Sequence, residues 1–160
     1  MKNTRIPRIW RLLKAKTIAL DLSERIKEKA IEELIDLLVE AKLLPDKTRA
    51  LENVLKREEM ISTGIGEGVA LPHAKYDKIT QPLLALGRSE EGLKFDSLDG
   101  KKVHLVFLLL SPQDDPAKYV KLLGKIARLL DSKELRDAVR KAESQQEIIE
   151  TIKEAERRLR

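Results

Sequence analysis

The stretch STGIGEGVALPHAK, residues 62–75 of the 160-residue chain, marks the change from predicted helices to predicted strands. Its three glycines, Gly64, Gly66 and Gly68, end the helical pattern before them, because glycine weakens helices and readily adopts a positive φ. The short apolar run that follows predicts a strand. The proline before His73 fixes its own φ and restricts its neighbour, so the histidine is presented from a stiff stretch.

Two interpretations of this stretch stay open. In the first, the glycines make a turn and His73 is a hydrogen-bonded structural residue, which spacing alone favours. In the second, the backbone and imidazole surround a charged group, since neutral imidazole is a competent nucleophile near pH 7. Phosphoryl transfer requires mainly positioning and charge stabilisation, for which Arg57 and Lys75 are candidate cations. Neither nucleotide motif, the Walker loop or G-x-G-x-x-G/A, occurs.

Helical periodicity predicts two helices before residue 62, over about residues 23–44 and 46–60. Asp21 or Ser23 is expected to cap the first helix, and a proline follows its end. The residues expected to face inward are Ile26, Ala30, Leu34, Leu37, Leu38 and Ala41 in the first helix and Ala50, Leu51, Val54 and Leu55 in the second.

Strands and then helices are predicted after residue 75. Residues 82–89 and 102–111 read as strands, the second buried and central, and 91–95 as a short edge strand before a turn. The expected helices begin at Pro116, capped by Asp115, then at residues 132 and 144. The stripe expected to be buried in the helix at Pro116 is Val120, Leu123, Ile126, Ala127 and Leu130. His104, inside the second strand, is interpreted as a satisfied core or sheet-face residue. The order of elements predicts one α/β (α+β) domain, a small sheet covered by helices.

The charge of the chain is unevenly distributed. The net charge is +5, but residues 1–20 carry +6 and no acid, so the rest sums to −1. The cations of this segment are Lys2, Arg5, Arg8, Arg11, Lys14 and Lys16. Because the remainder is nearly neutral and only 3% of residues are aromatic, a general nucleic-acid role is disfavoured. A solvated or loosely docked terminus is favoured over contact with an acidic partner or anionic lipid.

The composition excludes several classes of site. There is no cysteine, which rules out disulfides, thiolate catalysis and cysteine-based zinc sites and agrees with a cytoplasmic location. No apolar run approaches the ~20 residues of a membrane span, and Lys14 and Lys16 interrupt any signal-peptide core. No metal or cofactor is expected.

At LKREEMISTGIGEGVALPHAK, residues 55–75, the sequence resembles the enzyme IIA domain of the fructose/mannitol class of the bacterial phosphoenolpyruvate:sugar phosphotransferase system, especially the nitrogen-regulatory enzyme IIA. Residues 21–44, 95–112 and 127–152 resemble its first helix, central sheet segment and C-terminal helices. The resemblance runs from about Leu12 to Glu156. It implies a basic extension over 1–12 and a domain over 13–157, a mixed sheet with helices on both faces.

The resemblance also implies roles for individual residues. His73 would be the phosphorylated residue, with Arg57 beside it and Thr63, Gly64 and Gly66 framing the site. The sequence departs from the family at Tyr119, where many members carry a second histidine. Tyrosine donates a hydrogen bond but is not a cation at pH 7, so assistance by a protonated second histidine is in doubt.

The resemblance implies protein partners and leaves the role of the chain open. The donor would be the phosphocarrier protein HPr, and the recipient an enzyme IIB or a regulated kinase or transporter. The chain carries no IIB or membrane IIC segment, which favours regulation over sugar uptake. A binding module of the same fold without phosphotransfer is the alternative: retention of Arg57 and His73 speaks against it, and Tyr119 mildly for it.

Overall fold

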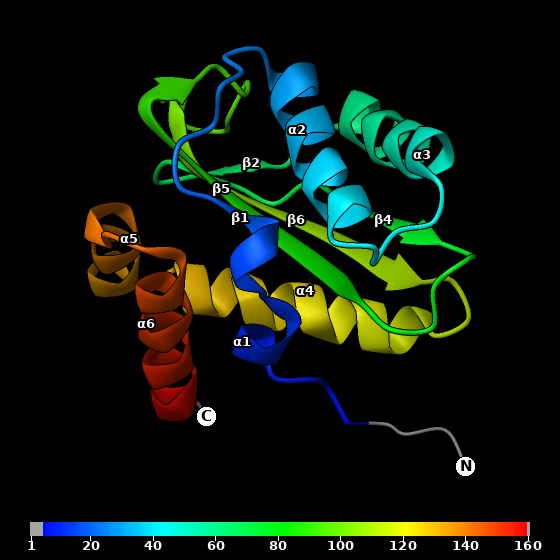
Figure 1. The fold of residues 1–160 in the computed structure, drawn as a ribbon. Coiled ribbons are helices and arrows are strands. Elements are labelled where there is room, and N and C mark those ends of the chain that lie inside the picture. The colour runs from blue at the N-terminus through cyan, green and yellow to red at the C-terminus, as the bar shows by residue number, and fades with distance from the viewer. Residues whose placement is uncertain (1–4, 160) are drawn as a thin grey trace.

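A mixed β-sheet forms the centre of the molecule in the computed structural model, which describes residues 5–159 (Figure 1). Its strands are β1 (Ile18–Ala19), β2 (Gly64–Gly66), β3 (Val69–Ala70), β4 (His73–Tyr76), β5 (Leu83–Leu93) and β6 (Val103–Pro112). The order is β1-β5-β6-β3-β2, and β4 pairs with β6 further along. β6 runs parallel to β3 and β4 and antiparallel to β5, which confirms it as the buried central strand.

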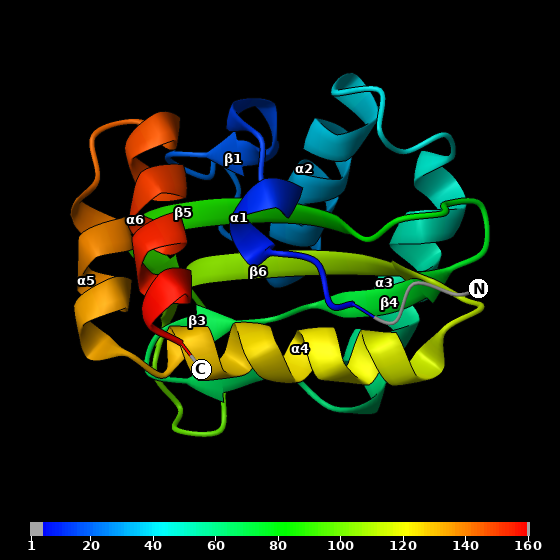
Figure 2. The same ribbon diagram turned by 90° about the horizontal axis from the view of Figure 1, so that it is seen from below.

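Helices cover both faces of this sheet, as Figure 1 and the view from below in Figure 2 show. They are α1 (Ile9–Leu12), α2 (Lys27–Glu40), α3 (Lys47–Met60), α4 (Pro116–Leu130), α5 (Lys133–Lys141) and α6 (Gln145–Arg158), with a 3-10 turn at Ala15–Thr17. α2 and α3 lie on one face, and α1, α4, α5 and α6 on the other. The predicted class, one α/β domain with helices on both faces, is confirmed.

Alternate side chains of β6 enter two separate hydrophobic cores, one on each face of the sheet. Leu105, Phe107 and Leu109 belong to the cluster under α4 and α6, while the residues between them join the cluster under α2 and α3. Successive side chains of a strand point to opposite faces, so a continuous apolar run fills both cores. This is why the longest apolar run of the sequence forms the centre of the fold.

Three predicted helix starts are confirmed. Asp115, Ser132 and Ser144 each accept a hydrogen bond from the backbone N–H three residues on, which satisfies one of the free donors of the first turn. Pro116 takes the first position of α4, where its missing N–H costs nothing.

Four sequence-based expectations are wrong. Residues 82–89 and 91–95 do not form two strands, because β5 continues through them to Leu93. α2 begins at Lys27 without a side-chain cap, and Ile26 is 62% exposed. The stripe of α4 is only partly as predicted, since Ile126 and Leu130 are buried but Val120 is 66% exposed and Tyr119 is buried in its place. The buried residues of α4 are Tyr119, Leu122, Ile126, Leu129 and Leu130. The aromatic ring of Tyr119 packs in the core under α4 and α6, and Val120 faces outward.

The basic N-terminal segment is firmly docked from Ile9 on, and is not a solvated tail there. Ile9 is fully buried, and its N–H and that of Trp10 donate to the carboxylate of Glu156 at 2.8 and 3.1 Å. Glu156 is 1% exposed and also pairs with Lys125, at 2.7 Å. Lys2 and the other residues of 1–4, and Arg160, lie outside the described residues. The boundary between an extension over 1–12 and a domain over 13–157 stays a prediction.

Replacing Glu156 by alanine should lower the free energy of unfolding by about 3 kcal/mol, because it leaves Lys125 and two backbone donors without an acceptor. Denaturant unfolding measures the loss. The matched control is Glu154→Ala on the same helix, whose exposed ion pairs of 3.7 Å are worth roughly 0.5 kcal/mol or less. Equal losses in the two variants would show that Glu156 does not anchor the N-terminal segment.

Candidate functional site

The register of β4 sets the direction of the His73 side chain. His73 pairs with Leu109 on β6, and the alternate residues Ala74 and Tyr76 enter the core under α2 and α3. His73 and Lys75 therefore face the side of the sheet that α4 covers. The strand is also the place where α3 packs, and Asn53 of α3 donates to the Lys75 carbonyl at 3.1 Å.

A single hydrogen bond orients the imidazole of His73. Its Nδ1 lies 2.7 Å from the Leu71 carbonyl oxygen. A carbonyl only accepts, so Nδ1 carries the proton, and the lone pair of the neutral ring is on Nε2. Within residues 5–159, Nε2 makes no hydrogen bond. The ring is therefore held through Nδ1, and its Nε2 is available to react.

The surroundings of His73 keep it neutral near pH 7. Burial lowers the pKa of this half-buried imidazole, and the positive charge of Arg57 lowers it further. The bond to Leu71 and the negative charge of Glu58 act in the opposite direction, but the pKa stays below the ordinary value of 6.5. A neutral imidazole with its lone pair on Nε2 is a nucleophile.

Tyr119, the position at which the resemblance led us to expect a second histidine, lies against His73. The two rings meet edge to face with centroids 5.8 Å apart. Burial raises the pKa of the Tyr119 phenol to about 12, and the charge of Arg57 offsets only part of this. The residue is thus an uncharged hydrogen-bond donor. The ammonium of Lys75 lies 5.9 Å from the Tyr119 ring centroid.

Arg57 reaches the site from the last turn of α3. Its Nη1 donates to the Ile61 carbonyl at 3.0 Å, which fixes the guanidinium just beyond the end of the helix. Its charge acts on the pKa of both His73 and Tyr119. The structure therefore brings His73, Arg57 and Tyr119 together.

Two residues that the sequence did not single out, Glu58 and Lys27, connect to the same site. The buried Glu58 carboxylate accepts from the Thr63 N–H at 3.0 Å, from the Thr63 hydroxyl, and from the Lys27 ammonium at 2.8 Å. The Thr63 carbonyl accepts the Leu71 N–H at 2.9 Å, and Leu71 holds His73. A chain of contacts thus runs from α2 to the imidazole. Glu58 follows Arg57 directly, but no spacing in the sequence indicates its pairing with Lys27.

The glycines build a hairpin and do not surround His73. Glu67 and Gly68 have φ of 57° and 79°, as in the two-residue turn that joins antiparallel strands β2 and β3. Gly66 lies opposite Val69, and Val69 pairs with Leu105 of β6. His73 pairs with Leu109, which is four residues or ~13 Å further along the same strand. A side chain at Gly64 would collide with Ser97. Of this loop, Thr63 is the residue that connects to the imidazole. Its hydroxyl donates to Glu58, and its carbonyl accepts from Leu71, which in turn holds His73.

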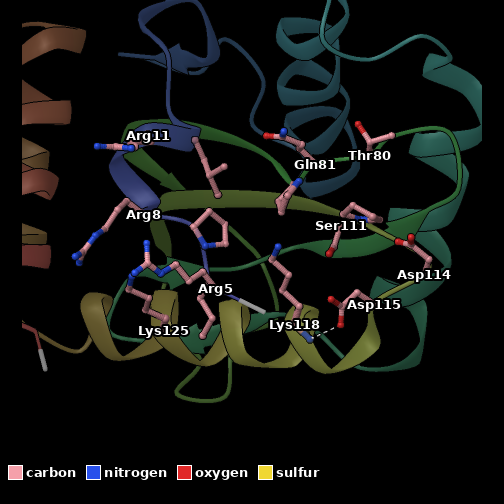
Figure 3. Close-up of a pocket in the computed structure, with 15 residues that line it drawn as sticks. Arg5, Arg8, Arg11, Thr80, Gln81, Ser111, Asp114, Asp115, Lys118 and Lys125 are labelled. Carbon is pink, nitrogen blue, oxygen red and sulfur yellow. Dashed lines mark hydrogen bonds between the residues drawn. The ribbon is translucent and has the colours of Figure 1, made fainter. Parts of the chain in front are cut away.

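A hollow lies between the N-terminal segment and the sheet, and His73 does not line it. It has a volume of about 990 Å³ between the N-terminal segment, the end of β6 and the start of α4. In Figure 3, Lys118 points into it, whereas the guanidinium groups of Arg8 and Arg11 point away. His73 is half-buried where β4 meets α4 and is not part of this hollow.

The second histidine has a structural setting. His104 Nδ1 lies 2.8 Å from the Ser89 carbonyl on the neighbouring strand, as expected for a satisfied sheet-face residue. Within residues 5–159, no three His, Asp or Glu side chains are grouped to hold a metal ion.

None of the helices described over residues 5–159 is long and apolar enough to cross a bilayer.

A protein-family model identifies the class of protein to which this chain belongs. The family model described as "Phosphoenolpyruvate-dependent sugar phosphotransferase system, EIIA 2" matches residues 11–155, and the chain belongs to this family. The resemblance inferred from the sequence is confirmed. Proteins of this family are phosphoryl carriers.

The relatives include both fructose-specific components of the phosphotransferase system and nitrogen regulatory proteins. The chain is 36% identical to the PTS system fructose-specific EIIA component of Haloferax volcanii, over 86% of this chain and 89% of that protein. It is 33% identical to the nitrogen regulatory protein of Pseudomonas aeruginosa, over 79% of this chain and 82% of that one. It is 38% identical to the fructose-specific EIIABC component of Bacillus subtilis, but spans only 23% of its length.

Solved structures share the fold. The crystal structure of the nitrogen regulatory protein IIA-Ntr from Neisseria meningitidis has a TM-score of 0.82 and 32% identity, covering 90% of this chain and 98% of that one. Enzyme IIA mannitol of Escherichia coli, solved in complex with phosphorylated enzyme IIB mannitol, has a TM-score of 0.75 at 20% identity, over 89% of this chain and 97% of that one.

The pKa of His73 should lie below 6.5 and rise when Arg57 is replaced by glutamine, because a nearby cation is removed. NMR titration of the ring protons measures both values. Lys56→Gln, which removes an exposed cation of the same helix, should leave the pKa unchanged. A pKa at or above 6.5 in the unmodified protein would contradict this description of the site.

Proposed function

We propose that the chain is a phosphoryl carrier of the phosphoenolpyruvate-dependent phosphotransferase system, and that it accepts a phosphoryl group on Nε2 of His73 from an HPr-like phosphocarrier protein. The observation that carries the proposal is the hydrogen bond from Nδ1 to Leu71, which leaves the other nitrogen as the nucleophile. Membership of the EIIA family supports it.

The transfer requires little chemistry from the protein. The Nε2 lone pair attacks phosphorus, a P–N bond forms, and the bond from phosphorus to the donor's leaving atom breaks and returns its electron pair to the donor. The proton on Nδ1 stays shared with the Leu71 carbonyl, which stabilises the positive charge that develops on the ring. We assign charge stabilisation on the phosphoryl oxygens to Arg57, with Lys75 as a further cation.

The surface around His73 suits a protein donor. Met60 and Ile61, which follow Arg57, are 81% and 60% exposed, and Val120 beside Tyr119 is 66% exposed. Exposed apolar residues around a charged centre are typical of docking sites. This also explains why Val120 departs from the buried stripe of its helix.

The recipient and the location are part of the same proposal. The complex of the mannitol protein with phosphorylated enzyme IIB supports a IIB recipient, and the nitrogen regulatory relatives support a regulatory role, for which we propose a regulated kinase or transporter as the target. A new charge of about −1.5 to −2 on His73 is large enough to make or break such an interface. We place the chain in the cytoplasm, with no nucleic-acid partner and no membrane insertion.

We assign a positioning role to Glu58, with Thr63 and Lys27. The Glu58 carboxylate fixes Thr63, whose carbonyl fixes Leu71, whose own carbonyl holds Nδ1 of His73. Gly64 and Gly66 support the site by forming the hairpin that keeps Thr63 in place. Tyr119 orients the ring from the other side but supplies no charge.

Incubation with phosphoenolpyruvate, enzyme I and HPr should add one acid-labile, base-stable phosphoryl group. It should be absent from His73→Ala and retained in His104→Ala. Arg57→Ala should slow transfer about 100-fold, since one preorganised charge contact is lost, while Lys56→Ala should not. Mass spectrometry and transfer rates measure these results.

Unchanged labelling of His73→Ala would overturn the proposal. Failure of the unmodified chain to be labelled by any such donor would favour the alternative, a binding module of the same fold that acts through protein contacts alone.

Replacing Glu58 by glutamine should reduce the rate of transfer about 10-fold and lower the population of the Nδ1–H tautomer of His73, because the contacts that hold Leu71 are loosened. Nitrogen-15 NMR of the unphosphorylated protein measures the tautomer independently of any transfer. Glu59→Gln, on the exposed neighbour, is the control. An unchanged tautomer with a reduced rate would show that Glu58 acts otherwise than by positioning.

A further inference from the structure

The basic N-terminal segment meets a second basic surface at the end of α6. Arg8 and Arg11 of the segment, with Lys153 and Arg157 of α6, line a hollow of about 270 Å³ together with Trp10 and Glu156. These groups lie far apart in the sequence, and the docking of α1 on α6 brings them together. Figure 2 shows that α6 and β4 lie at opposite ends of the sheet, and His73 does not line this hollow.

The single carboxylate that lines this hollow does not neutralise the cations. Glu156 is 1% exposed, and its oxygens accept from the N–H groups of Ile9 and Trp10 and from Lys125. Glu154 lies 3.7 Å from both Arg157 and Arg158 in exposed ion pairs, which contribute little. Four cations therefore surround the hollow with their charge mostly uncompensated.

Trp10 places two of these cations on one ring. The Arg11 guanidinium lies 5.2 Å and the Lys153 ammonium 4.6 Å from the ring centroid. Cation–π contacts of this kind hold the charges at the hollow without neutralising them. The Arg11 and Lys153 charges therefore share one aromatic ring at the edge of the hollow.

We propose that this hollow, bounded by Arg8, Arg11, Lys153 and Arg157 around Trp10, binds a phosphate-sized dianion. Guanidinium groups recognise phosphate oxygens with paired N–H donors, and an ammonium adds a point charge. The volume is below the ~300–1,000 Å³ of pockets that enclose whole drug-sized ligands, so it fits the phosphate group of a molecule or free phosphate. Anionic lipid is disfavoured, because Ile9 and Leu13, the apolar residues needed for insertion, are buried.

Trp10 is the one tryptophan of the chain and reports directly on this hollow. Titration of the full chain with sodium phosphate, at constant ionic strength maintained with sodium chloride, should change its fluorescence and the NMR shift of its indole N–H. The expected dissociation constant is about 1 mM or tighter. Arg8→Gln and Arg157→Gln should each weaken binding at least fivefold. Lys16→Gln, which removes an exposed cation of the same segment outside the hollow, should change it less than twofold.

Three results would overturn the proposal. The first is the absence of any change in either signal up to 50 mM phosphate, and the second is an equal response to chloride. The third is binding of phosphatidylglycerol vesicles without binding of phosphate, which would make the surface a membrane contact. The NMR spectrum of each variant shows whether it folds. Because no donor protein is involved, none of these results depends on phosphorylation of His73.

Discussion

The hydrogen bond between His73 Nδ1 and the Leu71 carbonyl is the contact on which the proposed chemistry depends. It fixes which ring nitrogen has the lone pair, and its acceptor is a backbone carbonyl. The carbonyl is itself held, because the Leu71 N–H is bonded to Thr63 and Thr63 is bonded to the buried Glu58. Burial and Arg57 then keep the ring neutral, so that one nitrogen donates and the other is free to react.

The sheet explains how residues distant in sequence meet at this imidazole. β4 lies beside the C-terminal half of β6, so α3 supplies Arg57 from beyond the strand and α4 supplies Tyr119 from the face that His73 occupies. The site is therefore assembled from three elements, and its imidazole is half-buried. A carrier that exchanges phosphorus between proteins requires the exposed part of this ring, whereas an enzyme acting on a free metabolite is usually served by an enclosing pocket.

Periodicity and capping residues predict most of the elements, because β6 is a continuous apolar run and Asp115, Ser132 and Ser144 carry their own capping groups. They do not predict the inward face of α4, where an amphipathic tyrosine replaces a valine, nor the cap-less start of α2 at Lys27. For the site, the family string identifies His73 and Arg57, but the Glu58–Lys27 pair depends on how α2 packs beside α3, which local sequence does not encode. The docking of Ile9 on Glu156 is likewise a tertiary contact between the two ends of the chain.

The position of phosphorus on the imidazole tests this account most directly. Nitrogen-15 NMR of the phosphorylated protein, with coupling to phosphorus-31, distinguishes the two ring nitrogens of His73. We expect phosphorus on Nε2, with the Nδ1 proton still hydrogen-bonded to the Leu71 carbonyl. Phosphorus on Nδ1 would contradict it, because that nitrogen would have to give up the contact that orients the ring.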